Sequence, residues 1–489
     1  MYSEDIDELK VRCICFSCVG EQHLSDEISA KGKRKKCNYC GQIGRSYSVG
    51  DVAKRVQTAF EQHYFRTSDQ PDDWESMLLR DRESNYEWDR HGEPVVYAIM
   101  NAAEISEEAA QDIQTILEDE HSDFDSAAMG EETEFADESY YEEKKVSDGA
   151  WPEEWRRFEN SLKTEARFFS RTAAAHLALI FAEIDTLRTY DGRPLVVDAG
   201  PGTDFHTLFR ARVFQSDEKL EAALCRPDHH LSSPPALLAA AGRMNARGIS
   251  VFYGANDPKA AIAEVRPPVG SQVAVAQFEI IRELRLLDLT ALKGVRVSGS
   301  IFDAGFATRL ERAQFLRSLS GRITQPVMPD DEPFEYLATQ AIADFLATES
   351  SVPVDGIIFP SVQIAGGGLN VVLFHKAARV DAMEIPVGTE ITARTGQFEE
   401  DGWEDDYSVI EKVPTTPMEG EEKEKEKEKD PGWPDFSAIA WEPVDSSSRK
   451  ASLRILHDSI KVHRVRRVLV ETDEFPVQRL RREKIKNEF

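Results

Sequence analysis

The spacing of apolar residues along the chain changes near residue 192, and the two spacings predict different secondary structures. Before this point apolar positions recur every three or four residues, which is typical of helices with one buried face. One such helix is predicted from Ser48, with Asp51 available near its start as a cap. A second begins near Pro152 and keeps a single apolar face for about nine turns. The first part of the chain is therefore expected to be largely helical.

Beyond Gly192 the apolar residues gather in short runs rich in branched and aromatic side chains, which favour strands. Two helices, over 258–265 and 336–347, are predicted among them. Strands and helices that do not alternate regularly are typical of an α+β fold. The predicted strands cover 195–197, 207–214, 249–253, 273–280, 284–289, 356–359, 370–374, 390–392 and 462–471.

Composition divides the chain into four parts. Residues 1–48 hold most of the cysteines and are expected to form a metal-binding knuckle, and residues 49–117 a helical region. Residues 118–150 are strongly acidic and are predicted to be a solvated linker. Residues 151–489 are expected to form the main domain, interrupted at 397–435 by a charged, low-complexity insertion that is mostly disordered.

The charge balance limits the classes of partner. The chain has 59 basic and 88 acidic residues, a net charge of −29, and residues 118–143 contain twelve acidic residues without a Lys or Arg. A nucleic-acid partner is therefore not expected. The start of the chain is acidic, and no apolar run approaches the roughly 18 residues of a membrane span. A cytoplasmic protein without membrane contact is expected.

Five of the six cysteines lie in the first forty residues. Two Cys-x2-Cys pairs, Cys15 with Cys18 and Cys37 with Cys40, are separated by eighteen residues. This spacing suits a tetrahedral zinc ion, and a closed set of four thiolates is structural rather than catalytic. Cys13 or His23 is an alternative for one of the four ligands.

Two segments combine glycines with residues capable of chemistry. In the first, a turn at Gly242 leads to a strand that ends in Tyr253, and an Asp-Pro helix start then precedes Glu264. In the second, a buried strand ends in Pro-Ser361 and is followed by three consecutive glycines and Asn370. No lysine follows the glycines as it would in a phosphate-binding loop. By themselves, these residues suggest only a pocket.

Together, the ordered motifs over 205–471 resemble the RES family, named for its Arg, Glu and Ser residues. The resemblance implies an α+β core similar to that of ADP-ribosyltransferases and membership among bacterial toxins that deplete NAD, many of which are paired with an antitoxin. The N-terminal part resembles the extension of a longer class, HEPN/RES, but residues 1–150 lack the Arg-x4-6-His ribonuclease motif. The matched residues are Arg210, Arg243, Asn245, Tyr253, Glu264, Ser361, Gly367, Gly368 and Asn370.

The resemblance also implies roles for these residues. Glu264 is expected to stabilise the positive charge that develops on the ribose when nicotinamide leaves. The guanidinium groups of Arg210 and Arg243 suit the phosphates, and Tyr253 suits stacking on the nicotinamide ring. Ser361 is expected to bind substrate, and Arg243, Tyr253 and Ser361 are assigned with Glu264 to catalysis. Substrate binding is assigned to Arg210, Asn245, Gly367, Gly368 and Asn370.

The function predicted from the sequence is that of an NAD-consuming toxin, a glycohydrolase or a phosphorylase, which takes NAD as substrate and contains a structural zinc ion. One alternative is an ADP-ribosyltransferase that modifies a macromolecule. Another is a non-catalytic zinc-knuckle protein that binds a nucleotide and interacts with partners. Water, phosphate and a macromolecule all remain open as acceptors. An antitoxin or a regulatory protein is the expected partner, consistent with a role in bacterial defence.

Overall fold

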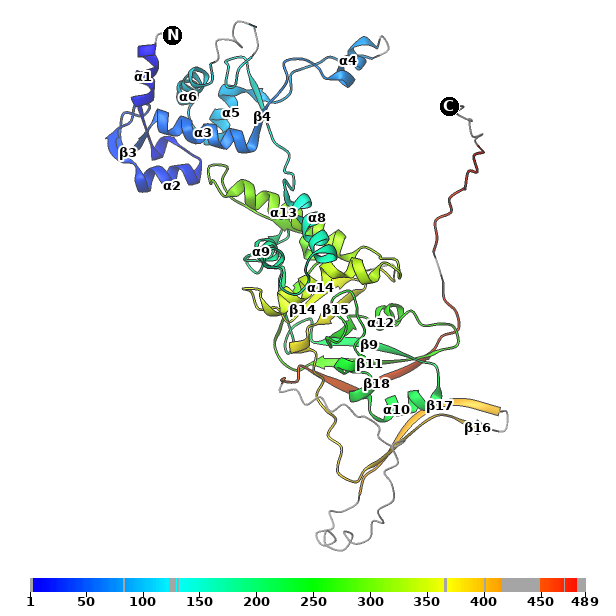
Figure 1. Cartoon of the computed structure of the whole chain (residues 1–489). Helices are drawn as coiled ribbons and strands as arrows, with labels where there is room; N and C mark the ends of the chain where they lie inside the picture. The colour runs from blue at the N-terminus through cyan, green and yellow to red at the C-terminus, as the bar shows by residue number, and fades with distance from the viewer. Residues whose placement is uncertain are drawn as a thin grey trace. The chain divides into compact units, whose positions relative to one another are not determined.

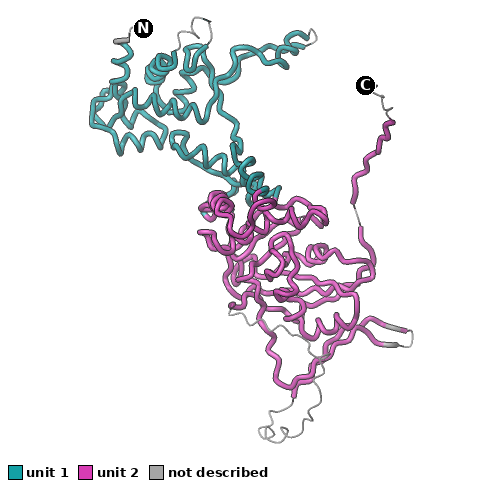
Figure 2. Tube along the Cα trace, in the orientation of Figure 1, with its two compact units in different colours: residues 1–160, 186–193, 291–322 teal, residues 161–185, 194–290, 323–489 magenta. Residues whose placement is uncertain are grey.

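The computed structural model describes residues 3–81, 84–122, 129, 132–364, 367–399, 402–414, 449–469 and 471–481. The chain divides into two compact units (Figure 2). Unit 1 comprises residues 1–160, 186–193 and 291–322, and unit 2 comprises residues 161–185, 194–290 and 323–489. Within the described residues, no helix combines the length and the apolar character needed to cross a membrane.

Unit 1 packs helices and small sheets around one apolar core. One sheet has the antiparallel order β1–β3–β2, and another has the order β4–β6–β5. Its elements include α1 (Ser3–Val11), β1 (Cys13–Cys15), η1 (Phe16–Cys18), α2 (Gln22–Lys31), β2 (Lys33–Lys36), β3 (Ile43–Ser48), α3 (Val49–His63), β4 (Tyr64–Arg66), α4 (Asp73–Arg80), β5 (Glu93–Pro94), α5 (Val95–Ala103), α6 (Glu107–Glu120) and β6 (Tyr140–Glu143).

The helix predicted after Ser48 is confirmed as α3, whose apolar residues Val52, Val56 and Phe60 are buried. Its cap differs from the expected one. The Ser48 hydroxyl accepts a 3.1 Å hydrogen bond from the Asp51 backbone N–H, so Ser48 is the cap and Asp51 lies in the first turn.

The prediction of a solvated linker over 118–150 is wrong for much of this segment. Helix α6 extends to Glu120, and β6 joins the second sheet of unit 1. Phe135 and Tyr141 are both buried in the core of this unit. The Tyr141 hydroxyl donates to Glu134 at 2.6 Å and accepts the Phe135 N–H at 3.0 Å. The acidic composition of this segment led to a linker prediction that overlooked two buried aromatic residues.

The single long helix predicted from Pro152 is also wrong, because it is divided into α8 (Trp151–Thr164) and α9 (Arg171–Ile180). Between them Phe168 and Phe169 are exposed, although the spacing of Phe169 fitted the apolar face. The Ser170 hydroxyl accepts the Ala173 N–H at 3.2 Å and caps a new helix.

Unit 2 is organised by an eight-stranded mixed sheet with the order β18–β11–β9–β10–β15–β14–β12–β8 (Figure 1). Neighbouring strands are antiparallel except β12 and β14, which are parallel. The α+β class is therefore confirmed. The strands are β8 (Val196–Ala199), β9 (Thr207–Phe214), β10 (Phe252–Ala255), β11 (Gln272–Ile280), β12 (Leu284–Asp288), β14 (Gly356–Pro360), β15 (Leu369–Leu373) and β18 (Leu453–Arg464).

Several elements differ from the expectations for this part of the chain, among them a strand, a helix and a hairpin. The last strand, β18, begins nine residues before the predicted 462–471 and ends at Arg464. Helix α13 (Phe306–Thr324), which precedes α14 (Glu332–Thr348), had no counterpart among the predicted elements. Within the insertion expected to be disordered, β17 (Gly402–Lys412) pairs with β16 (Glu390–Glu399).

The β16–β17 hairpin is stabilised across its strands by complementary polar groups. Arg394 pairs with Asp406 at 2.9 Å, and its Nε donates to the Ser408 hydroxyl at 2.7 Å. A charged sequence can therefore form an exposed ribbon. Residues 415–448, the remainder of the predicted insertion and a little beyond it, lie outside the described residues.

Candidate active site

A short helix, α12 (Pro258–Glu264), positions the carboxylate of Glu264. Asp257 caps this helix by accepting the N–H groups of Lys259 and Ala260 at 2.8 and 3.2 Å, and Pro258 occupies the first helical position, so the predicted Asp-Pro start is confirmed. The buried Ala260 and Ala261 pack the helix against the strands of the large sheet. Glu264 is the last helical residue, and it lines a pocket.

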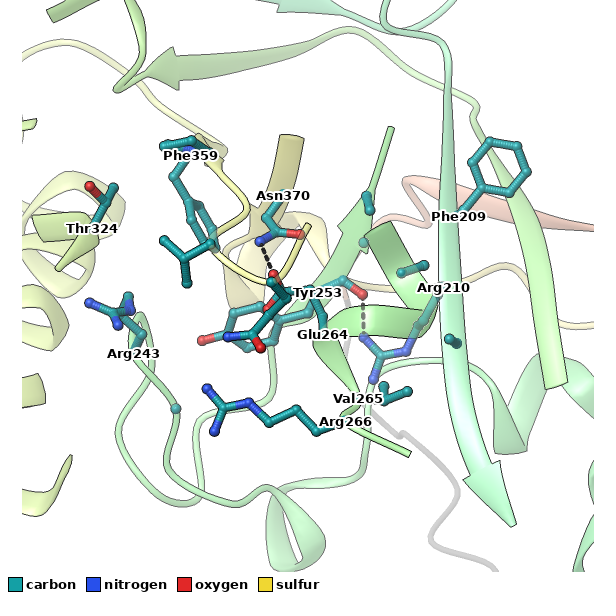
Figure 3. A pocket seen from close by; sticks show the side chains of 18 of the residues that line it. Phe209, Arg210, Arg243, Tyr253, Glu264, Val265, Arg266, Thr324, Phe359 and Asn370 are labelled. Atoms are coloured by element: carbon teal, nitrogen blue, oxygen red, sulfur yellow. Dashed lines mark hydrogen bonds between the residues drawn. The ribbon is translucent and has the colours of Figure 1, made fainter. Parts of the chain in front are cut away.

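Two side chains hold this carboxylate, and both come from the segment that contains the three consecutive glycines. The Ser361 hydroxyl donates to Glu264 Oε1 at 2.6 Å. The Asn370 amide nitrogen donates to the same oxygen at 2.8 Å, as Figure 3 shows. Ser361 directly follows β14, and Asn370 lies on the neighbouring strand β15. The other oxygen, Oε2, has no hydrogen-bond donor among the described residues. One oxygen is therefore fixed and the other is free for a ligand.

The glycines of the second segment shape the loop that carries Ser361. The Gly368 carbonyl accepts the Ser361 N–H at 2.8 Å. A Cβ at Gly368 would lie 2.4 Å from Ile364 Cδ1 and 3.0 Å from Ala260 Cβ, so a side chain at this position would displace Ile364. Gly367 has a φ of +93°, which favours glycine. Neither glycine lines the pocket, so the structure places them behind Ser361 rather than against a ligand.

The pocket has a volume of about 410 Å³, within the usual range for small-molecule sites. It collects side chains from β9, β10, α12, β14, β15 and α14, all in unit 2. Five of the predicted site residues line it, and Ser361 contacts it through Glu264. The five are Arg210, Arg243, Tyr253, Glu264 and Asn370.

Tyr253 presents its ring to the pocket while its hydroxyl is engaged elsewhere. The hydroxyl donates to Asn245 Oδ1 at 2.9 Å and accepts the Met244 N–H at 3.0 Å. Burial raises the pKa of Tyr253 to about 12, so its hydroxyl stays protonated at neutral pH. A Cβ at Gly242 would lie 2.8 Å from this hydroxyl oxygen, which explains the glycine in the turn.

Asn245 lies outside the pocket and organises the loop beside it. Its amide nitrogen donates to three backbone carbonyls, those of Ala240, Ala246 and Ile249, at 2.9 to 3.2 Å. The residue is buried, and its amide oxygen accepts the Tyr253 hydroxyl. The structure therefore gives Asn245 the position of a loop anchor, whereas the sequence assigned it to substrate binding.

Arg243 lines the pocket, but protein groups already occupy its guanidinium. Nη1 donates to the Ile323 carbonyl at 2.8 Å, and Nη2 donates to the Gln325 carbonyl at 2.9 Å. The guanidinium also lies 5.0 Å from the centroid of the Tyr336 ring. These contacts hold Arg243 against α14 and the end of α13.

Arg210 places a cation in the opposite wall of the pocket (Figure 3). Its Nη1 donates to the Tyr253 carbonyl at 2.8 Å, and the guanidinium lies 4.9 Å from the Phe252 ring centroid. Burial, followed by the charge of Arg212, lowers the pKa of Arg210 to about 10, so it remains charged at neutral pH. No carboxylate among the described residues pairs with it, which makes an anionic ligand favourable at this wall.

The structure adds pocket residues to which the sequence assigned no role, including Arg266, Tyr336 and Gln363. Arg266 follows α12 and is the clearest omission. Its sequence signal is weak, because an arginine before two prolines is also common on surface loops. The only sequence feature that points to Arg266 is its place just after the predicted helix that ends near Glu264.

The four cysteines predicted to bind zinc lie close together in unit 1. Their sulfur atoms are all within 4.8 Å of one another, with measured separations of 3.6, 3.7 and 3.8 Å. A tetrahedral zinc ion with bonds of about 2.3 Å would place its sulfurs about 3.8 Å apart, so Cys15, Cys18, Cys37 and Cys40 fit this metal. Cys13 instead directs its thiol toward the Val11 carbonyl, and neither it nor His23 belongs to the cluster.

Comparison with known families identifies one domain, most of which lies in unit 2. Residues 208–396 match the RES domain. The RES match covers the predicted catalytic and substrate-binding residues from Arg210 to Asn370. The RES family is associated with toxins and with NAD-related enzymatic activity. Comparison of the chain with curated proteins and with solved structures finds no match.

Proposed function

We propose that this protein cleaves the bond between nicotinamide and ribose in NAD. The observation that supports the proposal most directly is the carboxylate of Glu264, fixed through one oxygen by Ser361 and Asn370 at the edge of the pocket. The RES match provides independent support for NAD as the substrate class.

The chemistry requires a carboxylate of this kind. As neutral nicotinamide departs, positive charge develops on the ribose ring as in glycoside cleavage. Glu264 Oε2, which lacks a protein donor among the described residues, is free to accept the ribose 2′-hydroxyl and lie near the developing charge. The hydrogen bonds to Oε1 hold the carboxylate in one orientation before the substrate arrives, so little reorganisation is needed during reaction.

The remaining pocket residues suit the other parts of NAD. The ring of Tyr253 offers a face on which nicotinamide can stack while it leaves. Arg210 offers a fixed positive charge for a phosphate. The zinc ion would be held by the four cysteines in unit 1 and would stabilise their local fold, because four thiolates leave no open position for substrate.

The test is to incubate the purified chain with NAD and follow the release of nicotinamide. Intact protein is expected to release it, and Glu264→Gln is expected to lower the rate by about 10²–10³-fold, because the neutral amide cannot stabilise the cation equally well. Unchanged NAD in both phosphate-free and phosphate-containing buffer would contradict the proposal.

The same assay distinguishes the acceptors. Release that needs added phosphate would indicate phosphorolysis, whereas equal release without phosphate would indicate hydrolysis. NAD labelled in its adenosine part would leave label on a protein or nucleic acid if the chain is an ADP-ribosyltransferase. Binding without any release would favour a non-catalytic nucleotide-binding protein.

Loss of NAD would harm the cell that makes the enzyme. The proposal therefore includes a cytoplasmic toxin that an antitoxin or a regulatory protein restrains. Expression of the wild-type chain is expected to lower cellular NAD and stop growth, while Glu264→Gln is not. Equal toxicity of the two proteins would contradict this part of the proposal.

A further inference from the structure

The three arginines that line the pocket differ in what already holds their guanidinium groups. Arg243 donates to two backbone carbonyls and Arg210 to one. Arg266 makes no side-chain hydrogen bond or ion pair with any described residue. It is thus the one pocket arginine of the described chain whose entire donor fork is available to a ligand.

The side chain of Arg266 nevertheless points into the pocket. Figure 3 shows its guanidinium extending below Tyr253 toward the side of Arg243. Tyr336 lines the same pocket, and the charges of Arg243 and Arg266 both oppose the rise that burial causes in the pKa of Tyr336. An exposed arginine would ordinarily extend into solvent, so its direction needs an explanation.

The backbone of Arg266 adds a second observation. Its φ is +43°, in the left-handed region, at a position just after the helix where glycine is the usual residue. Pro267 follows and restricts this backbone further. A residue kept in a costly conformation, where glycine would fit more easily, indicates that its side chain is needed.

We propose that Arg266 forms a phosphate subsite, which binds the 5′-phosphate on the nicotinamide-bearing ribose of NAD. This inference rests on the proposed NAD cleavage. In a nicotinamide nucleotide the 5′-phosphate is attached to the same ribose whose bond to nicotinamide breaks. The group that binds this phosphate must therefore lie in the same pocket as Glu264, as Arg266 does.

A planar guanidinium with free donors binds phosphate oxygens through two parallel hydrogen bonds. Because the phosphate does not take part in bond breaking, its loss should weaken binding more than it slows the chemical step. Arg266 is accordingly a binding residue that distinguishes substrates by the presence of a phosphate group.

The test compares nicotinamide release from NAD and from nicotinamide riboside by the full-length chain. Arg266→Ala is expected to lower the ratio of the two kcat/KM values, NAD over riboside, by about 10- to 100-fold, mainly through KM for NAD. Arg266→Lys is expected to restore part of the ratio, since lysine keeps the charge but not the fork. Arg247→Ala is the matched control, because Arg247 is exposed on a neighbouring loop and does not line the pocket.

An unchanged ratio in Arg266→Ala, or an equal fall in Arg247→Ala, would overturn the phosphate subsite while leaving NAD cleavage intact. If wild-type protein releases nicotinamide from neither compound, the proposed cleavage fails, and calorimetric binding of ADP-ribose then decides the subsite. Affinity at least tenfold weaker for Arg266→Ala would support it. Equal affinity, or no binding to wild-type protein, would overturn it.

Discussion

The hydroxyl of Ser361 donates a 2.6 Å hydrogen bond to Oε1 of Glu264, although the two residues are 97 positions apart in the sequence. This contact indicates the role of the Ser361 hydroxyl. Its hydroxyl is directed to a carboxylate and not to a histidine base, so the geometry is not that of a serine nucleophile. Ser361 instead positions the carboxylate, together with Asn370.

Removing that hydroxyl should therefore lower the rate more than the affinity. We expect Ser361→Ala to reduce kcat for nicotinamide release about 10- to 100-fold with a smaller change in KM, because Glu264 loses one of two donors that orient it. Ser361→Thr keeps a hydroxyl and should retain most of the activity. Steady-state kinetics of both variants test this, and an effect confined to KM would contradict it.

The ring and the hydroxyl of Tyr253 should have separable effects. Tyr253→Phe removes the link between Asn245 and Met244 and should cost about 1–2 kcal/mol of folding stability. Tyr253→Leu also removes the stacking face and should reduce kcat/KM for NAD further, by about tenfold relative to Phe. Urea unfolding and nicotinamide release measure the two effects. Equal catalytic loss in both variants would argue against stacking.

Part of the candidate site could be predicted from the sequence, because five of its pocket residues occur in short motifs. Glu264, Tyr253 and Asn370 were found in this way, and the structure brings them to one pocket. Motif order does not report which groups a side chain contacts. Asn245 was therefore assigned to substrate although it binds three backbone carbonyls, and Arg266 was missed because only tertiary structure turns it inward.

The fold was predictable where the apolar pattern was regular and failed where other interactions decided the structure. Strand β9 has the expected bounds, because its sequence is continuously strand-like. The helix break near Ser170 depends on a local cap that competes with a continuing apolar period. Phe135 and Tyr141 were hidden by acidic neighbours, since composition averages over the few residues that form the core.

Single cysteine variants should distinguish the cysteines proposed to bind zinc from Cys13, whose thiol lies outside the cluster. We expect Cys18→Ser to lower the zinc content from about one ion per chain to nearly none, because three thiolates rarely retain a structural ion against competing chelators. Cys13→Ala should keep its zinc, since the Cys13 thiol contacts the Val11 carbonyl outside the cluster. Metal analysis after dialysis against a chelator tests both variants. Equal zinc loss in both would contradict the assignment.

An ion pair in unit 1 predicts that the stability of this unit depends on pH. Arg55 on α3 donates to both carboxylate oxygens of Glu27 on α2, at 2.8 and 2.9 Å. These bonds, with a smaller contribution from Lys31, lower the pKa of Glu27 to about 2. The unfolded chain, with a pKa near 4.5, binds the proton more readily. The stabilisation is therefore present above pH 4.5 and is lost as the pH falls toward 2.

Glu27→Gln should consequently destabilise α2 and α3 by about 2 kcal/mol at pH 7 and by progressively less below pH 4.5. Asp26→Asn is the matched control, because Asp26 is a neighbouring carboxylate whose only side-chain hydrogen bond among the described residues comes from Gln22. Hydrogen exchange of the α2 and α3 amides, measured at several pH values, gives the local opening free energy. The difference between Glu27→Gln and wild type should shrink in acid, since the protonated carboxyl no longer pairs with Arg55. A difference that is constant with pH would show that packing, and not the charge of Glu27, joins the two helices.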